Sequence, residues 1–304
     1  MIICDTHADT LYQIACGSTD KLDVTMERLE KGGVSLQVLA MFVGEDEDPV
    51  IIEKRFADML AAFEALIAQG WRQAFDPSEA EAGVVRTMLS IEGCEVFASG
   101  LHTIAPYREK GVRMAAVTWN YENALGIPAC VNEDQGLKPY GLRAVKEMQR
   151  LGIAVDVSHL NIAGFYDILN KTDAPPLASH SCCRALRDHP RNLTDGQLRD
   201  LFRAGGFVGL NFYPSFLADP GQPCDINTLI DHIDHMHQLG GAGMVGFGSD
   251  FDGIPSKPSG LDNPSDFPAL IQGLRKRGYG EEPVTSIAGQ ALMDYYRRLP
   301  QDRV

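Results

Sequence analysis

A chain of 304 residues that are 44% hydrophobic and 22% charged has the composition of an ordinary globular protein, with enough apolar sequence for a sizeable core. Its formal net charge of −14 argues against nucleic acid and anionic membranes as partners, because both need a basic face. It contains no apolar run of membrane-spanning length and no basic segment followed by an apolar one, so neither a membrane span nor a signal peptide is expected.

Strands and helices alternate along the whole sequence. Apolar runs typical of buried parallel strands occur at residues 2–4, 34–43, 84–91, 112–119, 153–157, 176–179, 207–212 and 244–248. Helices are predicted at residues 26–30, 50–69, 140–151, 162–169, 195–204, 226–239, 265–277 and 284–298. Helix-like sequence also leads up to Lys110, and residues 120–138 form a long polar loop.

Eight strands with interleaved helices predict an α/β fold of the (β/α)₈ TIM-barrel type, with the last two helices as additions at its C-terminal end. No repeat, low-complexity stretch or linker divides the sequence, so residues 1–304 are predicted to form a single domain. Barrels of this type carry their chemistry at the carboxyl ends of the strands. Functional side chains are therefore expected directly after the predicted strands.

Metal-binding side chains follow five of the predicted strands. His7 and Asp9 project together from the end of the first strand, because residues two apart on an extended backbone point to the same side. Imidazole nitrogens and carboxylate oxygens in one place are typical of a metal site. Since the carboxyl ends of barrel strands meet, we expect one cluster of six groups, formed by His7, Asp9, Glu92, His159, His180 and Asp250.

Glu92 follows a buried strand and precedes Gly93, where a surface carboxylate is the alternative. A buried carboxylate needs a cation, and its two oxygens can bridge two metal ions. Asp5 and Asp156 precede predicted ligands by two or three residues, and hydrogen bonds inside the barrel are their favoured role. Asp252 lies two residues beyond Asp250, which is nearer the strand end and is therefore preferred for chemistry.

Three histidines cluster at His232, His235 and His237, but they do not predict a metal site. At 3.6 residues per turn, His237 lies on the apolar face of its helix whereas His235 points away. The seven cysteines are scattered and include no Cys-x-x-Cys pair, which favours reduced thiols in a cytoplasmic protein. For the adjacent Cys182 and Cys183, buried inert thiols are favoured over redox sensing.

The order of these motifs resembles that of the membrane (renal) dipeptidase family, which belongs to the amidohydrolase-like metal-dependent barrels. The resemblance covers nearly the whole chain, and its motifs are specific in combination. They are His7-x-Asp9, Ile91-Glu92-Gly93, Asp156-Val157-Ser158-His159, Ser179-His180-Ser181, Arg191-Asn192 and Gly248-Ser249-Asp250-Phe251-Asp252-Gly253.

The resemblance implies two zinc ions per chain. His7 and Asp9 would bind one ion, His159 and His180 would bind the other, and Glu92 would bridge the two ions. Arg191 would hold the terminal carboxylate of the substrate, and Asp250 would act near the catalytic water. We also expect Trp119 and Tyr213 among the substrate-binding residues.

Two features depart from the family pattern. Trp119 stands where family members carry a histidine that polarises the scissile carbonyl group. The vertebrate enzymes are secreted and lipid-anchored, whereas this sequence shows neither signal, so a cytoplasmic location is expected. The sequence leaves the oligomeric state open, with a homodimer as the candidate assembly.

The predicted activity is that of a binuclear zinc dipeptidase. A metal-activated water would hydrolyse dipeptides with a free C-terminal carboxylate, with Glu92 holding the metals and Asp250 carrying the proton. One alternative is a related amidohydrolase acting on a cyclic amide, a lactam or an N-acyl amino acid. A second alternative is a metal-binding protein without catalysis, to which Trp119 alone points.

Overall fold

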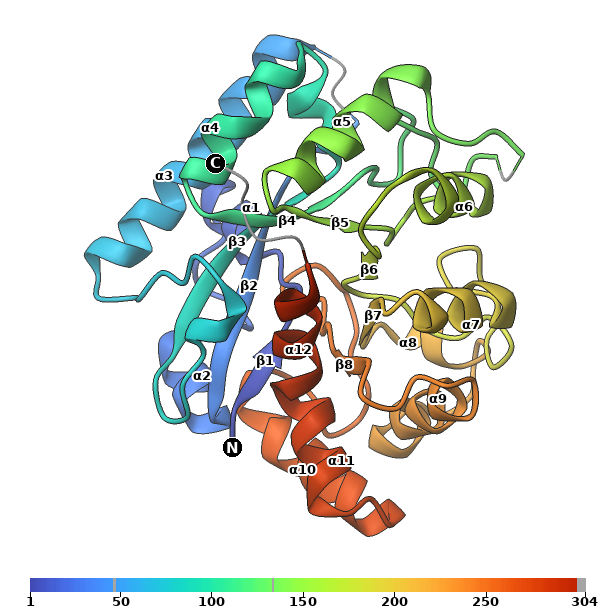
Figure 1. The fold of residues 1–304 in the computed structure, drawn as a ribbon. Helices are drawn as coiled ribbons and strands as arrows, with labels where there is room; N and C mark the ends of the chain where they lie inside the picture. Colours follow the sequence, from blue (N-terminus) through green and yellow to red (C-terminus); the bar gives the residue numbers. More distant parts are fainter. Residues whose placement is uncertain (46–47, 133, 300–304) are drawn as a thin grey trace.

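The computed structural model describes residues 1–45, 48–132 and 134–299. Eight parallel strands close into a barrel, and every strand pairs with its neighbours in chain order (Figure 1). The predicted (β/α)₈ fold is therefore confirmed. The strands are β1 (Ile3–Asp5), β2 (Val34–Phe42), β3 (Arg86–Glu92), β4 (Val112–Ala116), β5 (Ala154–Asp156), β6 (Leu177–Ala178), β7 (Phe207–Leu210) and β8 (Val245–Phe247).

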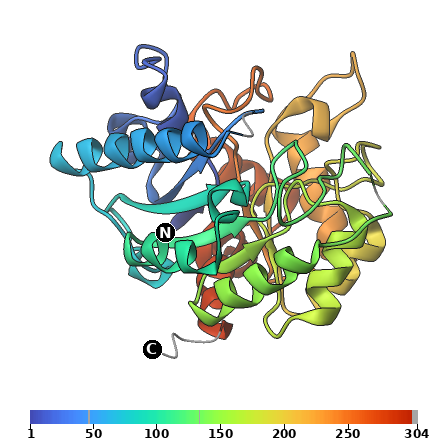
Figure 2. The ribbon, with the colours of Figure 1, turned by 90° about the horizontal axis from the view of Figure 1, so that it is seen from above.

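Helices surround the barrel on all sides. Two of them, α1 and α3, lie against each other and against β2 on the outside of the barrel (Figure 2). The α-helices are α1 (Thr10–Ala15), α2 (Met26–Gly32), α3 (Pro49–Ala68), α4 (Ile104–Glu109), α5 (Pro139–Arg150), α6 (Ile162–Lys171), α7 (Asp195–Arg203), α8 (Pro214–Leu217), α9 (Ile226–Gln238), α10 (Phe267–Arg277), α11 (Glu281–Thr285) and α12 (Ala291–Arg298). Short 3₁₀ helices are η1 (Pro77–Glu79), η2 (Cys94–Phe97), η3 (Leu101–Thr103) and η4 (Pro264–Asp266).

Several predicted strands were too long. The strand predicted at residues 112–119 ends at Ala116, and the next carbonyl, that of Val117, accepts from the backbone amide of Cys94 at 3.2 Å and from the side-chain amide of Asn123 at 2.8 Å. The helix predicted at residues 284–298 was also wrong as one element. It consists of α11, a π-helical segment η5 (Ser286–Gln290) and α12.

The C-terminal helix α12 closes the amino-terminal end of the barrel. Tyr295 and Tyr296 are fully buried and pack with inward-facing strand residues such as Met88, Met114 and Phe207. Their hydroxyls donate to the carbonyls of Pro175 and Arg113 at 2.8 and 3.0 Å. One end of the barrel is thus filled, and the opposite end is left for chemistry.

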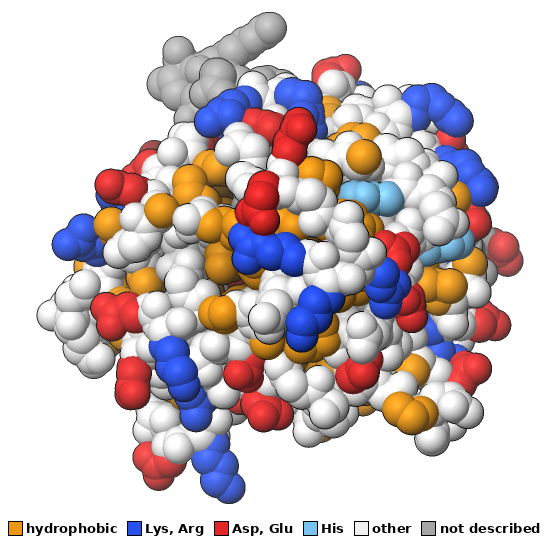
Figure 3. Space-filling model, turned by 90° about the horizontal axis from the view of Figure 1, so that it is seen from below, with side chains coloured by type: hydrophobic (Ala, Val, Ile, Leu, Met, Phe, Trp, Pro, Cys, Tyr) orange, Lys and Arg blue, Asp and Glu red, His pale blue; other side chains and the backbone are white. Residues whose placement is uncertain are grey.

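Figure 3 shows one face of the molecule. Acidic and basic side chains are interspersed there, with smaller apolar areas between them. Within the described residues, no helix is both long and apolar enough to cross a membrane.

Candidate metal centre and substrate site

The six predicted metal-binding side chains meet at the carboxyl ends of the strands. Two overlapping groups have ligand atoms within 4.8 Å of one another: His7 with Glu92 and His180, and His7 with Asp9 and Asp250. His159 adjoins the first group, because its Nε2 lies 2.8 Å from Glu92 Oε1. The structure therefore brings together all of the predicted ligands.

Glu92 lies at the centre of this cluster and is buried. Its Oε1 atom faces the Nε2 atoms of His159 at 2.8 Å and of His180 at 3.3 Å. Its Oε2 atom lies 3.6 Å from the Nε2 atom of His7, which is 3.4 Å from Asp9 Oδ1. The two oxygens of one carboxylate thus serve two neighbouring groups of potential ligands.

Hydrogen bonds at the far side of each ring fix the tautomers of His159 and His180. The Nδ1 atom of His159 lies 2.9 Å from the side-chain oxygen of Asn120, to which it must donate. The Nδ1 atom of His180 lies 2.7 Å from Ser179 Oγ, whose own proton goes to the carboxylate of Asp156. Both Nε2 atoms therefore carry lone pairs rather than protons.

These lone pairs point at one another. The Nε2 atoms of His159 and His180 are 2.9 Å apart, and both face Glu92 Oε1. Burial lowers the pKa of both imidazoles well below the ordinary value, with Arg191 and His7 adding to the shift. A bound cation would turn this repulsion into coordination.

The other half of the cluster has an excess of negative charge. Burial opposes protonation of His7, yet the carboxylates of Glu92, Asp9 and Asp250 raise its pKa to about 10. Burial raises the pKa of Glu92 well above its ordinary value, and Asp9 and Asp250 add to this. Among the described residues, His7 Nε2, Asp9 Oδ1 and Glu92 Oε2 have no hydrogen-bond partner although they are buried. Such orphaned atoms around one point fit a divalent metal ion.

The backbone is strained where it delivers these side chains. Within the described chain, the non-glycine residues with positive φ are His159 at 67°, Asp250 at 65° and Asp252 at 65°. The left-handed conformation is costly for such residues and is concentrated at functional sites. His159 and Asp250 have this left-handed backbone conformation, and the side chains of both residues lie at the cluster.

Asp5 and Asp156 support the cluster from below, as expected. Asp5 accepts hydrogen bonds from Ser249 Oγ at 2.5 Å and from Gln37 Nε2 at 3.0 Å. Asp156 accepts from the backbone amides of Ser158 and Ser179 at 2.8 and 3.0 Å. These contacts confirm that both carboxylates are used inside the barrel.

Asp252 faces away from the cluster. It accepts from Thr10 Oγ1 at 2.6 Å and from the backbone amides of Asp23 and Val24, so it holds the segment before α2. Asp250 instead lies 3.9 Å from His7 Nε2 through Oδ1, while its Oδ2 accepts from Asn211 at 2.9 Å. The preference for Asp250 agrees with this geometry.

Arg191 and Tyr213 both contact Phe216. The buried guanidinium of Arg191 donates to the His180 carbonyl at 3.4 Å and stands 5.5 Å over the ring of Phe216. Its Nε has no partner among the described residues. Tyr213 makes an edge contact of 4.9 Å with the same Phe216 ring.

Trp119 lies near His159. Its half-buried ring is 6.5 Å from the ring of His159 and 5.2 Å from that of Phe42.

Sequence reasoning missed Asn120, Ser179 and Phe216, which orient His159, His180 and Arg191. Ser179 and Asn120 directly adjoin the predicted site residues His180 and Trp119, and that adjacency was the available signal.

Among the described residues, no histidine of helix α9 belongs to a group of side chains that could hold a metal ion. However, the fully buried histidine is His232, whose Nδ1 accepts from the amide of Cys183 at 3.1 Å, whereas His237 is half-buried.

Cys182 and Cys183 are free and buried, and burial raises the pKa of both thiols. This environment agrees with inert thiols.

Comparisons with known proteins agree with these observations. The family model of the membrane dipeptidases, peptidase family M19, matches residues 1–299. Two Schizosaccharomyces pombe proteins, each described as an uncharacterized dipeptidase, are similar to the chain. One is 38% identical over 194 residues, which are 62% of this chain and 47% of that protein. The other is 33% identical over 216 residues, which are 70% and 53%. The chain thus spans about half the length of these relatives.

Solved structures share the whole fold. A metallopeptidase from Rhodobacter sphaeroides, liganded with a phosphinate mimic of the dipeptide L-Ala-D-Ala, is 25% identical with a TM-score of 0.90 over 99% of both chains. A dipeptidase described as a metallopeptidase of family M19 is 26% identical with a TM-score of 0.90 over 98% of this chain and 99% of that one. An amidohydrolase from Pseudomonas aeruginosa, at 22% identity and TM-score 0.84 over 98% and 96%, shares the fold.

Adding ZnCl₂ to metal-free protein is expected to raise Tm, because a cation relieves the repulsion among the buried lone pairs. Binding at 100 times Kd stabilises a fold by about 2.7 kcal/mol. Differential scanning fluorimetry with and without zinc measures the effect. His235→Ala, outside the cluster, should keep the shift, whereas His180→Ala should reduce it. An unchanged Tm on zinc addition to the unsubstituted protein would contradict a metal centre.

Glu92→Gln is expected to lower metal content at both halves of the cluster, since one charged oxygen is replaced by an amide nitrogen that cannot ligate. Elemental analysis after dialysis against dilute zinc measures this, with about two ions per chain expected before the substitution. The exposed Glu27 of α2 offers the control Glu27→Gln. Full metal content in Glu92→Gln would refute the central role of Glu92.

Proposed function

Because the chain belongs to the membrane dipeptidase family, peptidase family M19, we propose that it is a zinc-dependent dipeptidase acting on dipeptides with a free C-terminal carboxylate. One observation carries the proposal. The orphaned atoms of His7, Asp9 and Glu92 converge at the open end of the barrel, with the buried guanidinium of Arg191 close by. The three orphaned atoms would bind a cation, and the guanidinium of Arg191 would bind an anionic group of the substrate.

We assign two zinc ions to the cluster. His7 and Asp9 would hold one, His159 and His180 would hold the other, and Glu92 would contact both. The orphaned atoms and opposed lone pairs described above support this division. When bound, such ions would act as Lewis acids on the scissile carbonyl and lower the pKa of a water toward neutrality.

Asp250 is assigned the proton transfer. Its Oδ1 lies toward the cluster, 3.9 Å from His7 Nε2, while the Asn211 amide holds its Oδ2. The free oxygen could accept a proton from the attacking water and deliver it to the leaving amine. The bond to Asn211 restricts the rotation of the carboxylate and so keeps Oδ1 aimed at the reacting atoms.

Arg191 is assigned to the substrate carboxylate. Its guanidinium is planar, buried and only partly satisfied, and Phe216 supports one face of it. A fork of this kind binds a carboxylate with two parallel hydrogen bonds. Tyr213 packs on the same Phe216 ring and would line this end of the substrate site.

Trp119 would line the opposite end of the substrate site. Its ring neighbours His159 at 6.5 Å, and its indole N–H can donate a hydrogen bond but cannot carry a charge. Any contact to the developing oxyanion from this position would be neutral. Its large ring would also limit the side chains that fit.

The same residues could serve a related amidohydrolase acting on a cyclic amide, a lactam or an N-acyl amino acid. A panel of L,L- and L,D-dipeptides, set against N-acyl amino acids and lactams, separates these substrates. Turnover of any dipeptide would exclude a metal-binding protein without catalysis. A cytoplasmic location and a homodimer stay predictions.

Arg191→Lys is expected to raise KM for free-acid dipeptides about tenfold or more, because the charge remains but the fork is lost. C-terminal amides of the same dipeptides should change much less. Steady-state kinetics on both substrate series measures the difference. The control Arg187→Lys lies in the same loop and pairs with Asp219. Equal effects on acids and amides would refute the assignment.

Trp119→His is expected to widen the range of dipeptides cleaved, or to raise kcat for bulky ones, because the smaller ring opens the site and can carry a charge. Removing one good oxyanion donor costs about 2.7–4 kcal/mol of transition-state stabilisation. Replacing the neutral indole donor with histidine can recover part of this free energy. Values of kcat/KM across a dipeptide panel measure this. If both Trp119→His and Trp119→Ala leave every value unchanged, Trp119 does not contact the substrate.

A further inference from the structure

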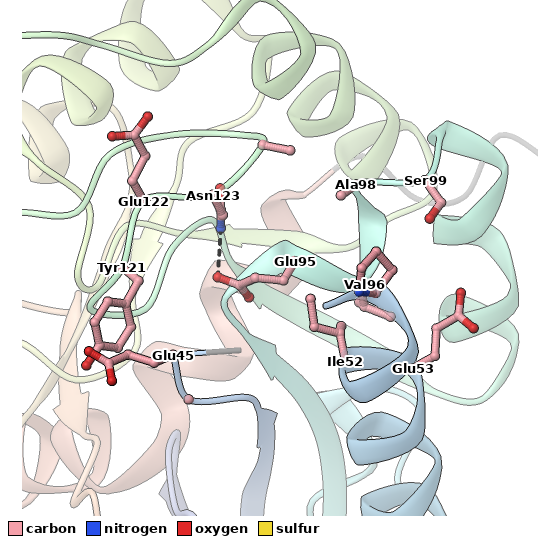
Figure 4. A pocket seen from close by; sticks show the side chains of 13 residues that line it. Glu45, Ile52, Glu53, Glu95, Val96, Ala98, Ser99, Tyr121, Glu122 and Asn123 are labelled. Atoms are coloured by element: carbon pink, nitrogen blue, oxygen red, sulfur yellow. Dashed lines mark hydrogen bonds between the residues drawn. The ribbon is translucent and has the colours of Figure 1, made fainter. Parts of the chain in front are cut away.

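A pocket lies at the same end of the barrel as the metal cluster. This acidic pocket, as we name it, has a volume of about 290 Å³ and is lined by residues that follow β2, β3 and β4 and by the first turns of α3 (Figure 4). The lining residues used below are Glu45, Ile52, Glu53, Glu95, Val96 and Tyr121. None of the predicted metal ligands lines it.

The charge of the acidic pocket is one-sided. Four glutamates and no lysine or arginine are among the described residues that line it. Glu122 is neutralised by Lys138 at 2.7 Å, and the Tyr121 hydroxyl lies against Glu45. Among the described residues, no basic side chain forms an ion pair with Glu53 or Glu95, and both carboxylates remain for a ligand.

Glu95 is the residue that most needs a partner. Its Oε1 accepts a single hydrogen bond from Asn123 Nδ2 at 3.0 Å, and its buried Oε2 has no partner among the described residues. Burial raises the pKa of Glu95 to about 7. Figure 4 shows its carboxyl group inside the pocket, between Tyr121 and Ile52. A buried carboxylate of this kind is costly until a donor or a cation reaches it.

Apolar groups complete the lining. Ile52 and Val96 are buried and face the same space as the carboxylates. A long side chain with a methylene stem and a charged end meets both requirements, since the stem packs on apolar surface while the head pairs with carboxylates. Lysine and arginine side chains have this construction.

The acidic pocket and Arg191 lie at different strand ends of the barrel. Arg191 lies in the loop after β6, whereas the loops that line the pocket follow β2, β3 and β4, which are four, three and two strands away from β6 in the closed eight-strand order. A dipeptide with its carboxylate at Arg191 and its peptide bond at the metal cluster directs its amino-terminal residue toward β2–β4. Aromatic rings continue in that direction, because Trp119 lies 6.5 Å from the His159 ring and Tyr121 lies 5.6 Å from Trp119.

We propose that the acidic pocket receives the cationic side chain of a lysine or arginine at the amino-terminal position of the substrate. The inference rests on the proposed dipeptidase function and adds a side-chain preference to it. Glu95 would pair with the charged end from inside the pocket, Glu53 would add charge at the exposed rim, and Ile52 and Val96 would contact the stem.

The test compares Lys-Ala with norleucine-Ala, which differ in the terminal ammonium. The metal-loaded protein is expected to show a kcat/KM about tenfold or more higher for Lys-Ala. Glu95→Gln should reduce this ratio at least about fivefold, and Glu53→Gln should reduce it less, because an exposed charge contributes less. The control Glu64→Gln removes an exposed charge from the same helix α3, outside the pocket, and should keep the ratio.

Equal rates for the two dipeptides, or a ratio unchanged in both Glu95→Gln and Glu53→Gln, would overturn the proposal while leaving the dipeptidase function intact. If neither dipeptide is hydrolysed, the proposed function fails. Calorimetric titration with agmatine then shows independently whether the acidic pocket binds a cation. Saturable agmatine binding that is lost in Glu95→Gln supports a cation site. Absence of agmatine binding by the unsubstituted protein would refute it.

Discussion

The buried carboxylate of Glu92, held between the Nε2 atoms of three imidazoles, is the interaction on which the rest of the structure depends. Each of these atoms comes from the end of a different strand, so their approach to within 2.8–3.6 Å is fixed by the barrel rather than by local sequence. Converging lone pairs and carboxylates are unfavourable without a cation. A closed, rigid sheet is therefore the scaffold that can hold them in place until one binds.

The two ends of the barrel have different roles: one end is packed and stabilises the fold, and the other end carries the candidate metal centre. At one end, tyrosines from α12 fill the interior and donate to the carbonyls of Arg113 in β4 and of Pro175 before β6. A layer of hydrogen bonds follows, in which Asp5 is paired with Ser249 and Asp156 with Ser179. Ser179 connects this layer to the cluster, because it receives the Nδ1 proton of His180. The orientation of a ligand thus depends on a carboxylate one layer below it.

Buried apolar runs that end in a polar residue are visible in the sequence, and they predict the strands of the barrel and the ends of those strands. For this reason the barrel and its six clustered side chains could be predicted. The strand end at Ala116 was missed because the next carbonyl, that of Val117, is bonded by loop groups, the backbone amide of Cys94 and the side-chain amide of Asn123. The surroundings of Glu95 also depend on a residue distant in sequence, since Asn123 donates to it. In α9, packing buries His232 rather than His237.

The closure of the barrel by β1 and β8 also has a consequence for synthesis. His7 and its neighbour Asp250 are about 240 residues apart in the chain, as are β1 and its pairing partner at Phe247. Strands β1 and β2 must therefore wait, with their apolar faces incompletely covered, until β8 and α12 have been made. The metal-binding geometry can form only after β8 has been synthesised, and the partly made barrel is the stage at which chaperones have most surface to protect.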